Sequence, residues 1–302
     1  MDKNAGPLLP LHITQALQSA ETACGADSAA ACHDEVLRLA DAIAYYLGAV
    51  AVAQYSQALY TGEIEADPTL NRSLRSLRRI LPGQWLVWAA RGLQSTPNGP
   101  VEGIYSWYTS PSGSEVNAAY ETLRRVMVDD LEYTGEYGQR ESVSPRVLLE
   151  MVDQYRIRRS KAASGAISDE TVREVAGALL SGLRAMMSDA DFMSSYVLFA
   201  PQQRQLLMGA KATTPMPPMT APGDATATIL LYPPGEPPDY TVRPNLRAER
   251  VPLFPLDPLL AYLQCEECDR YVIAALREVV GGMPAYSGLD PRCEHEIKPT
   301  IE

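Results

Sequence analysis

Apolar residues recur at helical spacing through much of the first 195 residues. The stretch from Ala26 to Tyr60 is rich in alanine and holds no proline, which favours a helix. Its apolar side chains recur at the intervals of one helix face. These positions are Val36, Leu39, Ala40, Ile43, Leu47, Val50 and Ala51. We therefore expect one long, buried helix here.

Helix start signals divide the rest of this region. Asp67 is a good N-cap and is followed by a proline, so we expect a helix from there to Ile80. Ser168 begins half of a capping box ahead of the last long helix. Further helices are expected over 84–93, over 114–133 and from 145 through 155.

The pattern changes from helical to strand-like near Ser195. Residues 196–199 form a short strand candidate, and residues 205–208 form another. Residues 226–232 are rich in β-branched and aromatic side chains, so they are the clearest strand of the chain. We expect these strands to belong to a sheet.

Proline-dense connections separate the predicted strands. Residues 214–222 and 233–238 hold too many prolines for central strands or helices. The sequence therefore predicts an α+β fold. We expect a helical domain over residues 1–195 and a small, loop-rich β domain over residues 196–302.

Composition and charge narrow the class of protein. Hydrophobic residues make up 46% and charged residues 21%, as in globular proteins. The net charge of −11 disfavours non-specific nucleic-acid coating and anionic membranes as partners. We expect no transmembrane helix and no signal peptide, because no long apolar run or basic leader is visible. Nucleotide fingerprints and nucleophile elbows are also absent from the sequence, so no small-molecule cofactor is expected.

The five cysteines do not look like a disulfide framework. Cys24 and Cys32 lie near the N-terminus, whereas Cys265, Cys268 and Cys293 lie near the C-terminus. An odd, divided set of this kind is typical of reduced thiols. We therefore expect a cytoplasmic location.

The C-terminal cysteines form a candidate zinc site. Cys265 and Cys268 have the spacing of a zinc knuckle, and Cys293 with His295 could supply two further ligands. This set predicts a closed, structural zinc site in a zinc-ribbon-like domain. Two alternatives stay open: metal-free thiols, and a redox Cys-x-x-Cys, which the lack of a βαβ pattern disfavours.

A run of basic and small residues, YRIRRSKAASG over 155–165, ends one predicted helix. It resembles the end of a helix in HEPN domains, where an arginine, often followed by asparagine, precedes a histidine–glycine pair. A Pro-Gly-x-Trp run at 82–85 fits the same layout. So does PLDPLLAYLQCEEC over 255–268, which resembles a run in related bacterial proteins. The resemblance covers most of the chain and implies a HEPN-like helical domain followed by a β-rich segment.

Ser164 stands where the family has its histidine. Arg159 takes the place of the family's arginine, Ser160 that of the asparagine, and Gly165 matches the glycine. In the family, the histidine moves a proton and the arginine steadies the phosphate during metal-independent RNA cleavage. A serine hydroxyl does not titrate near neutrality, so the motif predicts no nuclease activity.

The three histidines do not restore the motif by their positions in the sequence. His12 and His33 have no arginine at the family's spacing before them, and Arg292 precedes His295 too closely. We therefore expect no catalytic residue. The resemblance implies a non-catalytic interaction, sensing or adaptor module in bacterial signalling or defence, with a protein partner or a homodimer.

Two groups of arginines are candidates for nucleic-acid binding. Arg156, Arg158 and Arg159 lie near a predicted helix end, and Arg72 and Arg75 share one helix face. A solvated surface explains either group, and phosphate contact is the alternative. The alternative function is therefore a HEPN-type endoribonuclease or RNA-binding protein. A third hypothesis places the activity in a further domain that follows residue 302.

Overall fold

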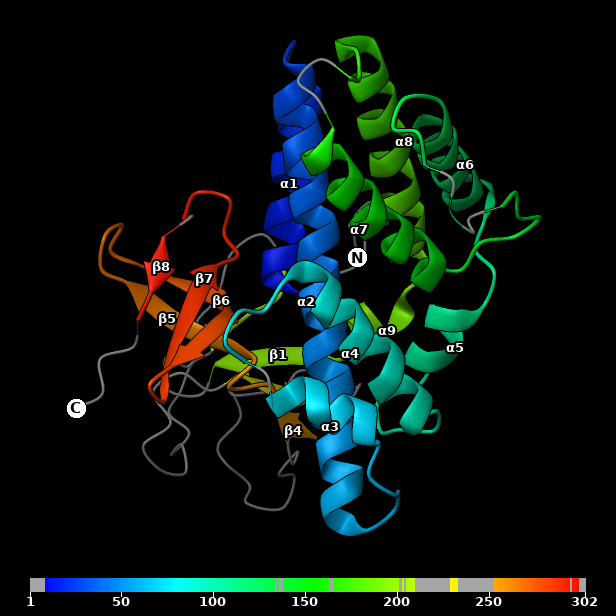
Figure 1. The fold of residues 1–302 in the computed structure, drawn as a ribbon. Coiled ribbons are helices and arrows are strands. Elements are labelled where there is room, and N and C mark those ends of the chain that lie inside the picture. The colour runs from blue at the N-terminus through cyan, green and yellow to red at the C-terminus, as the bar shows by residue number, and fades with distance from the viewer. Residues whose placement is uncertain are drawn as a thin grey trace, which may run out of the picture. The chain divides into compact units, whose positions relative to one another are not determined.

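The computed structural model describes residues 9–75, 77–133, 135, 138–162, 166–200, 203, 205–209, 229–232, 253–293 and 295–298. Its helices are α1 (Leu11–Cys24), α2 (Ala29–Thr61), α3 (Pro68–Arg75), α4 (Pro82–Ser95), α5 (Ile104–Thr109), α6 (Ser114–Asp129), α7 (Pro145–Lys161), α8 (Asp169–Ser188) and α9 (Asp191–Ser195). Its strands are β1 (Val197–Ala200), β2 (Gln205–Leu206), β3 (Leu230–Tyr232), β4 (Phe254–Pro255), β5 (Leu260–Cys265), β6 (Arg270–Val280), β7 (Met283–Gly288) and β8 (Glu296–Ile297). The predicted α+β class is confirmed (Figure 1).

The chain forms two compact units, each from separate stretches of sequence. Unit 1 comprises Met1–Gln15, Tyr45–Glu102 and Asp191–Glu302, and unit 2 comprises Ala16–Ala44 and Gly103–Ala190. The change from helix to strand falls at residue 195, between α9 and β1, as the sequence indicates. Unit 1 nevertheless combines helices from the first half of the chain with the strands.

Unit 2 is a helical assembly in which α6 contacts both α7 and α8 (Figure 1). The predicted N-cap Ser168 is present, since its hydroxyl accepts from the Thr171 amide, and the Ser144 hydroxyl caps α7 by accepting from the Val147 amide. Gly182 lets α8 approach α6 closely, because a Cβ there would lie 2.7 Å from that of Ala119. The predicted helices of this region are therefore confirmed, with ends shifted by a few residues.

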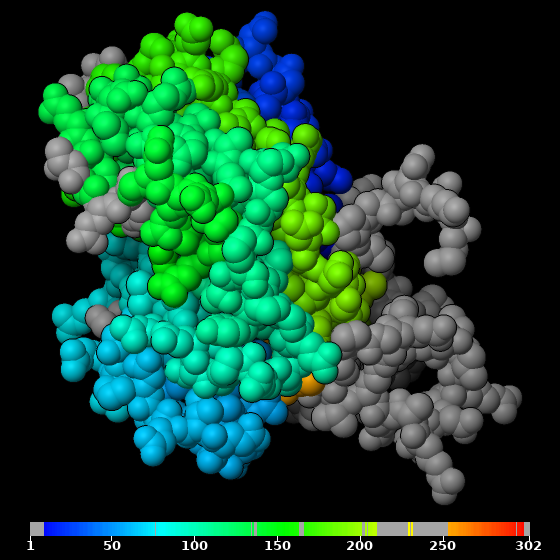
Figure 2. Space-filling view, turned by 90° about the vertical axis from the view of Figure 1, so that its right-hand side faces the viewer, coloured from blue at the N-terminus to red at the C-terminus, as the bar shows by residue number. Residues whose placement is uncertain are grey.

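The helices of unit 1 pack through two glycines. A Cβ on Gly48 would lie 2.9 Å from the Trp85 backbone oxygen, and one on Gly92 would lie 2.8 Å from that of Ala51. Both glycines thus let α4 lie close against α2, with Trp85 and Trp88 fully buried beside it. The end of α2 lies at the surface, in light blue in Figure 2, where Tyr60 is exposed.

The described residues of unit 1 also form two antiparallel sheets. Their strand orders are β2-β1-β3-β4 and β5-β6-β7-β8. Gly281 and Gly282 join β6 to β7 with positive φ angles of 60° and 84°, which suits a two-residue hairpin. β6 continues beyond β5, and its edge there pairs with the turn after α3. The Val279 amide donates to Leu77 O and the Ile80 amide donates to Arg277 O, each at 2.7 Å.

Several sequence-based expectations differ from the structure. The helix expected to reach Ile80 ends at Arg75, because Leu77 and Ile80 pair with β6 instead. The sequence patterns predict neither α1 nor α5. Of the strand predicted over 226–232, residues 229–232 are described and contain β3, whereas the proline-dense segments lie outside the described residues.

α2 also bears on the membrane prediction. It is long and apolar enough to cross a membrane by length and composition, although no such helix was expected. However, 72% of its most apolar stretch is buried inside the fold. The core helix of a water-soluble protein meets the same length and composition criteria.

Cys24 and Cys32 form a disulfide between the end of α1 and the first turn of α2. The expectation that all cysteines are reduced is therefore wrong for this pair. The hairpin between the two helices brings the sulfur atoms together, and the eight-residue separation alone did not reveal it. Cys265, Cys268 and Cys293 are free thiols, as expected.

Candidate functional site

The four candidate metal ligands meet at one end of the sheet β5–β8. Cys265 ends β5, Cys268 lies in the turn to β6, and Cys293 and His295 lie between β7 and β8. One donor atom from each residue lies within 4.8 Å of all the others. Sheet pairing thus assembles the set that the spacing predicted, and these residues could bind a metal ion.

Local backbone structure brings the two pairs of ligands together. Asp269 adopts a positive φ of 49° in the β5–β6 turn, and Cys265 pairs with Arg270 across it. On the other side, the Cys293 amide donates to Asp290 O at 2.8 Å. Gly288 leaves room for this loop, because a Cβ there would lie 2.5 Å from the Cys293 carbonyl oxygen. The ligands therefore stand on a hairpin turn and a tight loop that face each other.

His295 is oriented by contacts on both ring nitrogens. Its Nδ1 lies 3.3 Å from Cys265 Sγ and 3.9 Å from Cys293 Sγ. Its Nε2 lies 3.3 Å from the Glu267 carboxylate. Metal-binding histidines commonly donate their second nitrogen to a carboxylate in this way. Nδ1 is therefore the atom that faces the thiols.

The thiols differ in how readily they ionise. Burial, with hydrogen bonds to Cys268 and Cys265, raises the pKa of Cys293 to about 12. Burial acts in the same direction on Cys268, but hydrogen bonds from Cys265, Cys293 and Arg270 outweigh it and lower the pKa of that thiol. A thiolate at Cys268 is thus stabilised by its neighbours, and a cation would stabilise all three thiolates more strongly.

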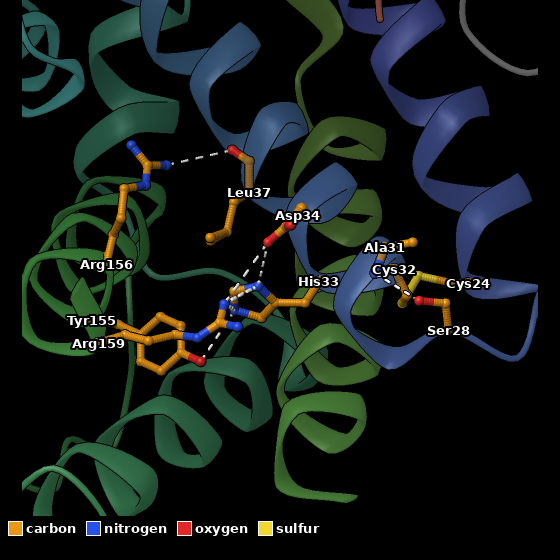
Figure 3. A network of polar contacts seen from close by, with 10 residues as sticks. All are labelled: Cys24, Ser28, Ala31, Cys32, His33, Asp34, Leu37, Tyr155, Arg156 and Arg159. Atoms are coloured by element: carbon orange, nitrogen blue, oxygen red, sulfur yellow. Dashed lines mark hydrogen bonds and ion pairs between the residues drawn. A yellow bond between two sulfur atoms is a disulfide. The ribbon is translucent and has the colours of Figure 1, made fainter. Parts of the chain in front are cut away.

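Unit 2 contains a second polar cluster, around His33 (Figure 3). His33 lies in the first turns of α2 and is fully buried. Its Nε2 lies 3.1 Å from the Tyr155 hydroxyl and 2.9 Å from Arg159 Nη1, both on α7. Its Nδ1 lies 3.2 Å from the Asp34 carboxylate and also contacts Arg159. The disulfide joins Cys32, the preceding residue, to Cys24.

The environment keeps the His33 imidazole neutral. Burial, followed by the nearby Arg159 charge, lowers its pKa to about 4, although Asp34 opposes the shift. Burial likewise raises the pKa of Tyr155 to about 12. Near neutral pH the cluster therefore combines a neutral imidazole and phenol with a charged guanidinium.

The arginines at the end of α7 are engaged inside unit 2. Arg156 forms an ion pair with Asp41 at 2.6 Å. The Arg158 guanidinium lies 4.8 Å from the centre of the Tyr133 ring, in cation–π geometry. With Arg159 held against His33, each of the three candidate nucleic-acid contacts on α7 has an internal partner.

The other two candidates, Arg72 and Arg75, are exposed on α3. They differ from the α7 group because neither forms an ion pair within the described part of the chain. Ser164 and Gly165 of the HEPN-like motif lie outside the described residues.

The contact between Arg159 and His33 joins residues 126 positions apart. A search for histidines at a fixed spacing after an arginine could not find it, because the two side chains come from different helices. No local sequence signal marks His33 as the partner.

Comparison with protein-family models, curated proteins and solved structures gives no match for this chain. The HEPN resemblance therefore stays a prediction from the sequence motifs.

Proposed function

We propose that the protein is a non-catalytic protein-interaction module whose C-terminal sheet is stabilised by a structural zinc ion. The observation that carries the proposal is the convergence of Cys265, Cys268, Cys293 and His295. Four protein donors fill a tetrahedral zinc shell and leave no position for a substrate or reactive water. Thiolate and imidazole ligands favour zinc over magnesium or calcium. The ion would add stability to a sheet with a small core of its own.

The positions of the histidines support a non-catalytic role. The chain has three, of which His12 and His33 are fully buried and His295 belongs to the thiol cluster. A general base must reach the proton that it moves, and neither buried imidazole faces solvent. The HEPN-like assignment and a role in bacterial sensing or defence belong to the same proposal, and they rest on the sequence motifs.

Metal analysis tests the structural part of this proposal. We expect the protein, purified under mild reducing conditions, to contain about one zinc ion per chain by mass spectrometry. Cys268→Ser should lose the ion, whereas the matched control Cys24→Ser/Cys32→Ser should keep it. A wild-type chain that neither contains zinc nor takes it up after reduction would contradict the proposal.

Partner capture tests the interaction part. The tagged protein should recover a stoichiometric protein partner, or a second copy of itself, from nuclease-treated extract of its own cells. Recovery of RNA alone from untreated extract would contradict this part and favour the alternative function.

That alternative is an RNA-binding protein or endoribonuclease, and the contact between Arg159 and His33 is the observation that favours it. Its test is cleavage of labelled RNA by the wild type and by His33→Ala and Arg159→Ala variants. Cleavage that both variants abolish, while both stay folded, would establish the alternative.

A further inference from the structure

Positive charge is concentrated in one segment of an acidic protein. Between Pro68 and Val101 the chain has five arginines but no aspartate, glutamate or lysine, although its net charge is −11. This segment contains α3, the turn that pairs with β6, and α4. All of it belongs to unit 1.

Four of these arginines form an exposed group that we call the arginine ridge: Arg72, Arg75, Arg78 and Arg79. Within the described ranges, no carboxylate forms an ion pair with any of them, and the fifth, Arg91, lies 4.0 Å from Asp67. Exposed arginines elsewhere, such as those at 125 and 184, are paired with glutamates. The ridge therefore presents guanidinium groups whose binding capacity is unused inside the described fold.

The backbone of the ridge is fixed at both ends. On α3, Ser73 Oγ accepts a hydrogen bond from Trp88 Nε1 at 2.8 Å. After α3, the hydrogen bonds from Val279 to Leu77 and from Ile80 to Arg277 hold the turn against β6. A partner would therefore bind side chains on backbone that is already held at Ser73, Leu77 and Ile80, which lowers the entropic cost of binding.

Two exposed apolar side chains lie on the β6–β7 hairpin, next to the part of β6 that pairs with the turn after α3. Val279, which pairs with Leu77 of that turn, is followed by Val280. Val280 faces Met283 across the hairpin. These two side chains, which we call the apolar tip, are 62% and 48% exposed, respectively. Arginine and methionine beside exposed apolar groups are typical of protein–protein interfaces.

We infer that the arginine ridge and the apolar tip bind a segment of a partner protein that combines carboxylates with apolar side chains. The inference rests on the proposed interaction function and names its surface and partner chemistry. Charge complementarity requires an anion, because the ridge has no internal counter-charge among the described residues. A nucleic-acid strand would supply phosphates, but it would leave the tip unused, since the tip offers no aromatic ring for a base to stack on.

Fluorescence anisotropy with three labelled probes of equal net charge tests this inference. The first is a peptide in which glutamate alternates with leucine, the second has serine in place of leucine, and the third is oligouridylate. We expect the leucine peptide to bind most tightly, with an affinity that falls as salt is added. The ridge variant, Arg72→Glu/Arg75→Glu/Arg78→Glu/Arg79→Glu, should bind it at least about tenfold more weakly.

Matched variants separate the two parts of the surface. Val280→Ser/Met283→Ser should reduce the leucine peptide to the affinity of the serine peptide and leave the latter unchanged. Arg125→Glu/Arg184→Glu makes charge changes of the same kind elsewhere and should leave binding unchanged.

Two results would overturn the inference: peptide affinity that is the same in the ridge variant and the wild type, or oligouridylate that binds more tightly than both peptides through the ridge. Zinc content and circular dichroism of each variant keep the outcomes distinct. Lost peptide binding in a folded, zinc-containing ridge variant supports the inference. Zinc-free wild type contradicts only the proposed structural ion.

Discussion

Replacing His33 by glutamine keeps hydrogen-bonding atoms beside Tyr155 and Arg159 but removes a group that can take up a proton. In the folded chain the pKa of this buried imidazole is lowered to about 4, whereas the ordinary value is 6.5. Above pH 6.5 the imidazole is neutral in both states. As the pH falls below 6.5, the unfolded chain binds a proton that the folded chain excludes. The free energy of unfolding therefore decreases as the pH falls from 6.5 towards 4.

The size of the effect follows from the shift. One pKa unit corresponds to about 1.4 kcal/mol, so the full shift is worth about 3 kcal/mol, of which about 2 kcal/mol is lost by pH 5. Asp41 acts in the opposite direction between pH 6 and pH 4. Burial raises the pKa of Asp41 to about 6 despite Arg156. As the pH falls, this carboxyl therefore takes up its proton in the folded chain before it does so in the unfolded chain, which favours the folded state. Because wild type and His33→Gln share Asp41, their difference isolates the imidazole.

The assay is urea denaturation of both proteins at pH 7.5, 6, 5 and 4.5, followed by circular dichroism. We expect the wild type to lose about 2 kcal/mol relative to the variant between pH 7.5 and pH 5. The variant's own stability at neutral pH does not matter, because only the change with pH is compared. A difference between the two proteins that stays constant over this range would refute a buried, neutral His33.

Three further predictions concern other parts of the chain. Cys293→Ser should abolish zinc binding and speed hydrogen exchange in β5–β8, while the amides of unit 2 keep their protection. Cys32→Ser, or reduction of its disulfide with Cys24, should lower the free energy of unfolding by about 2–3 kcal/mol, as expected for a short closed loop; unchanged denaturation with and without reductant would contradict this. Gly48→Ala should lower Tm, because the added Cβ would lie 2.9 Å from the Trp85 oxygen, at a cost of about 1–3 kcal/mol.

The candidate metal cluster could be predicted from the sequence because its ligand residues form two pairs with short spacings along the chain. The two-residue gap between Cys265 and Cys268 fits a tight turn, and Cys293 and His295 lie close enough in sequence to share one loop. The capped helices were predictable for the same reason, since the hydroxyl of Ser168 bonds an amide three residues away.

Contacts between distant segments could not be predicted in this way. The end of α3 is set by residues of β6 about two hundred positions later, so local helical propensity gave too long a helix. His33 meets Arg159 only because α2 and α7 run side by side there. The disulfide between Cys24 and Cys32 likewise depends on the angle between two helices, which spacing does not encode.

The sharing of α2 between the two units has a consequence for how this protein can be divided or recombined. Residues up to Ala44 belong to unit 2 and residues from Tyr45 to unit 1, with no break in the helix. A chain truncated after residue 195 would retain the α2–α4 part of unit 1 but lose both sheets, including the strand that anchors the turn after α3. A gene fusion or domain swap made at residue 195 would therefore separate the strands of unit 1 from its helices.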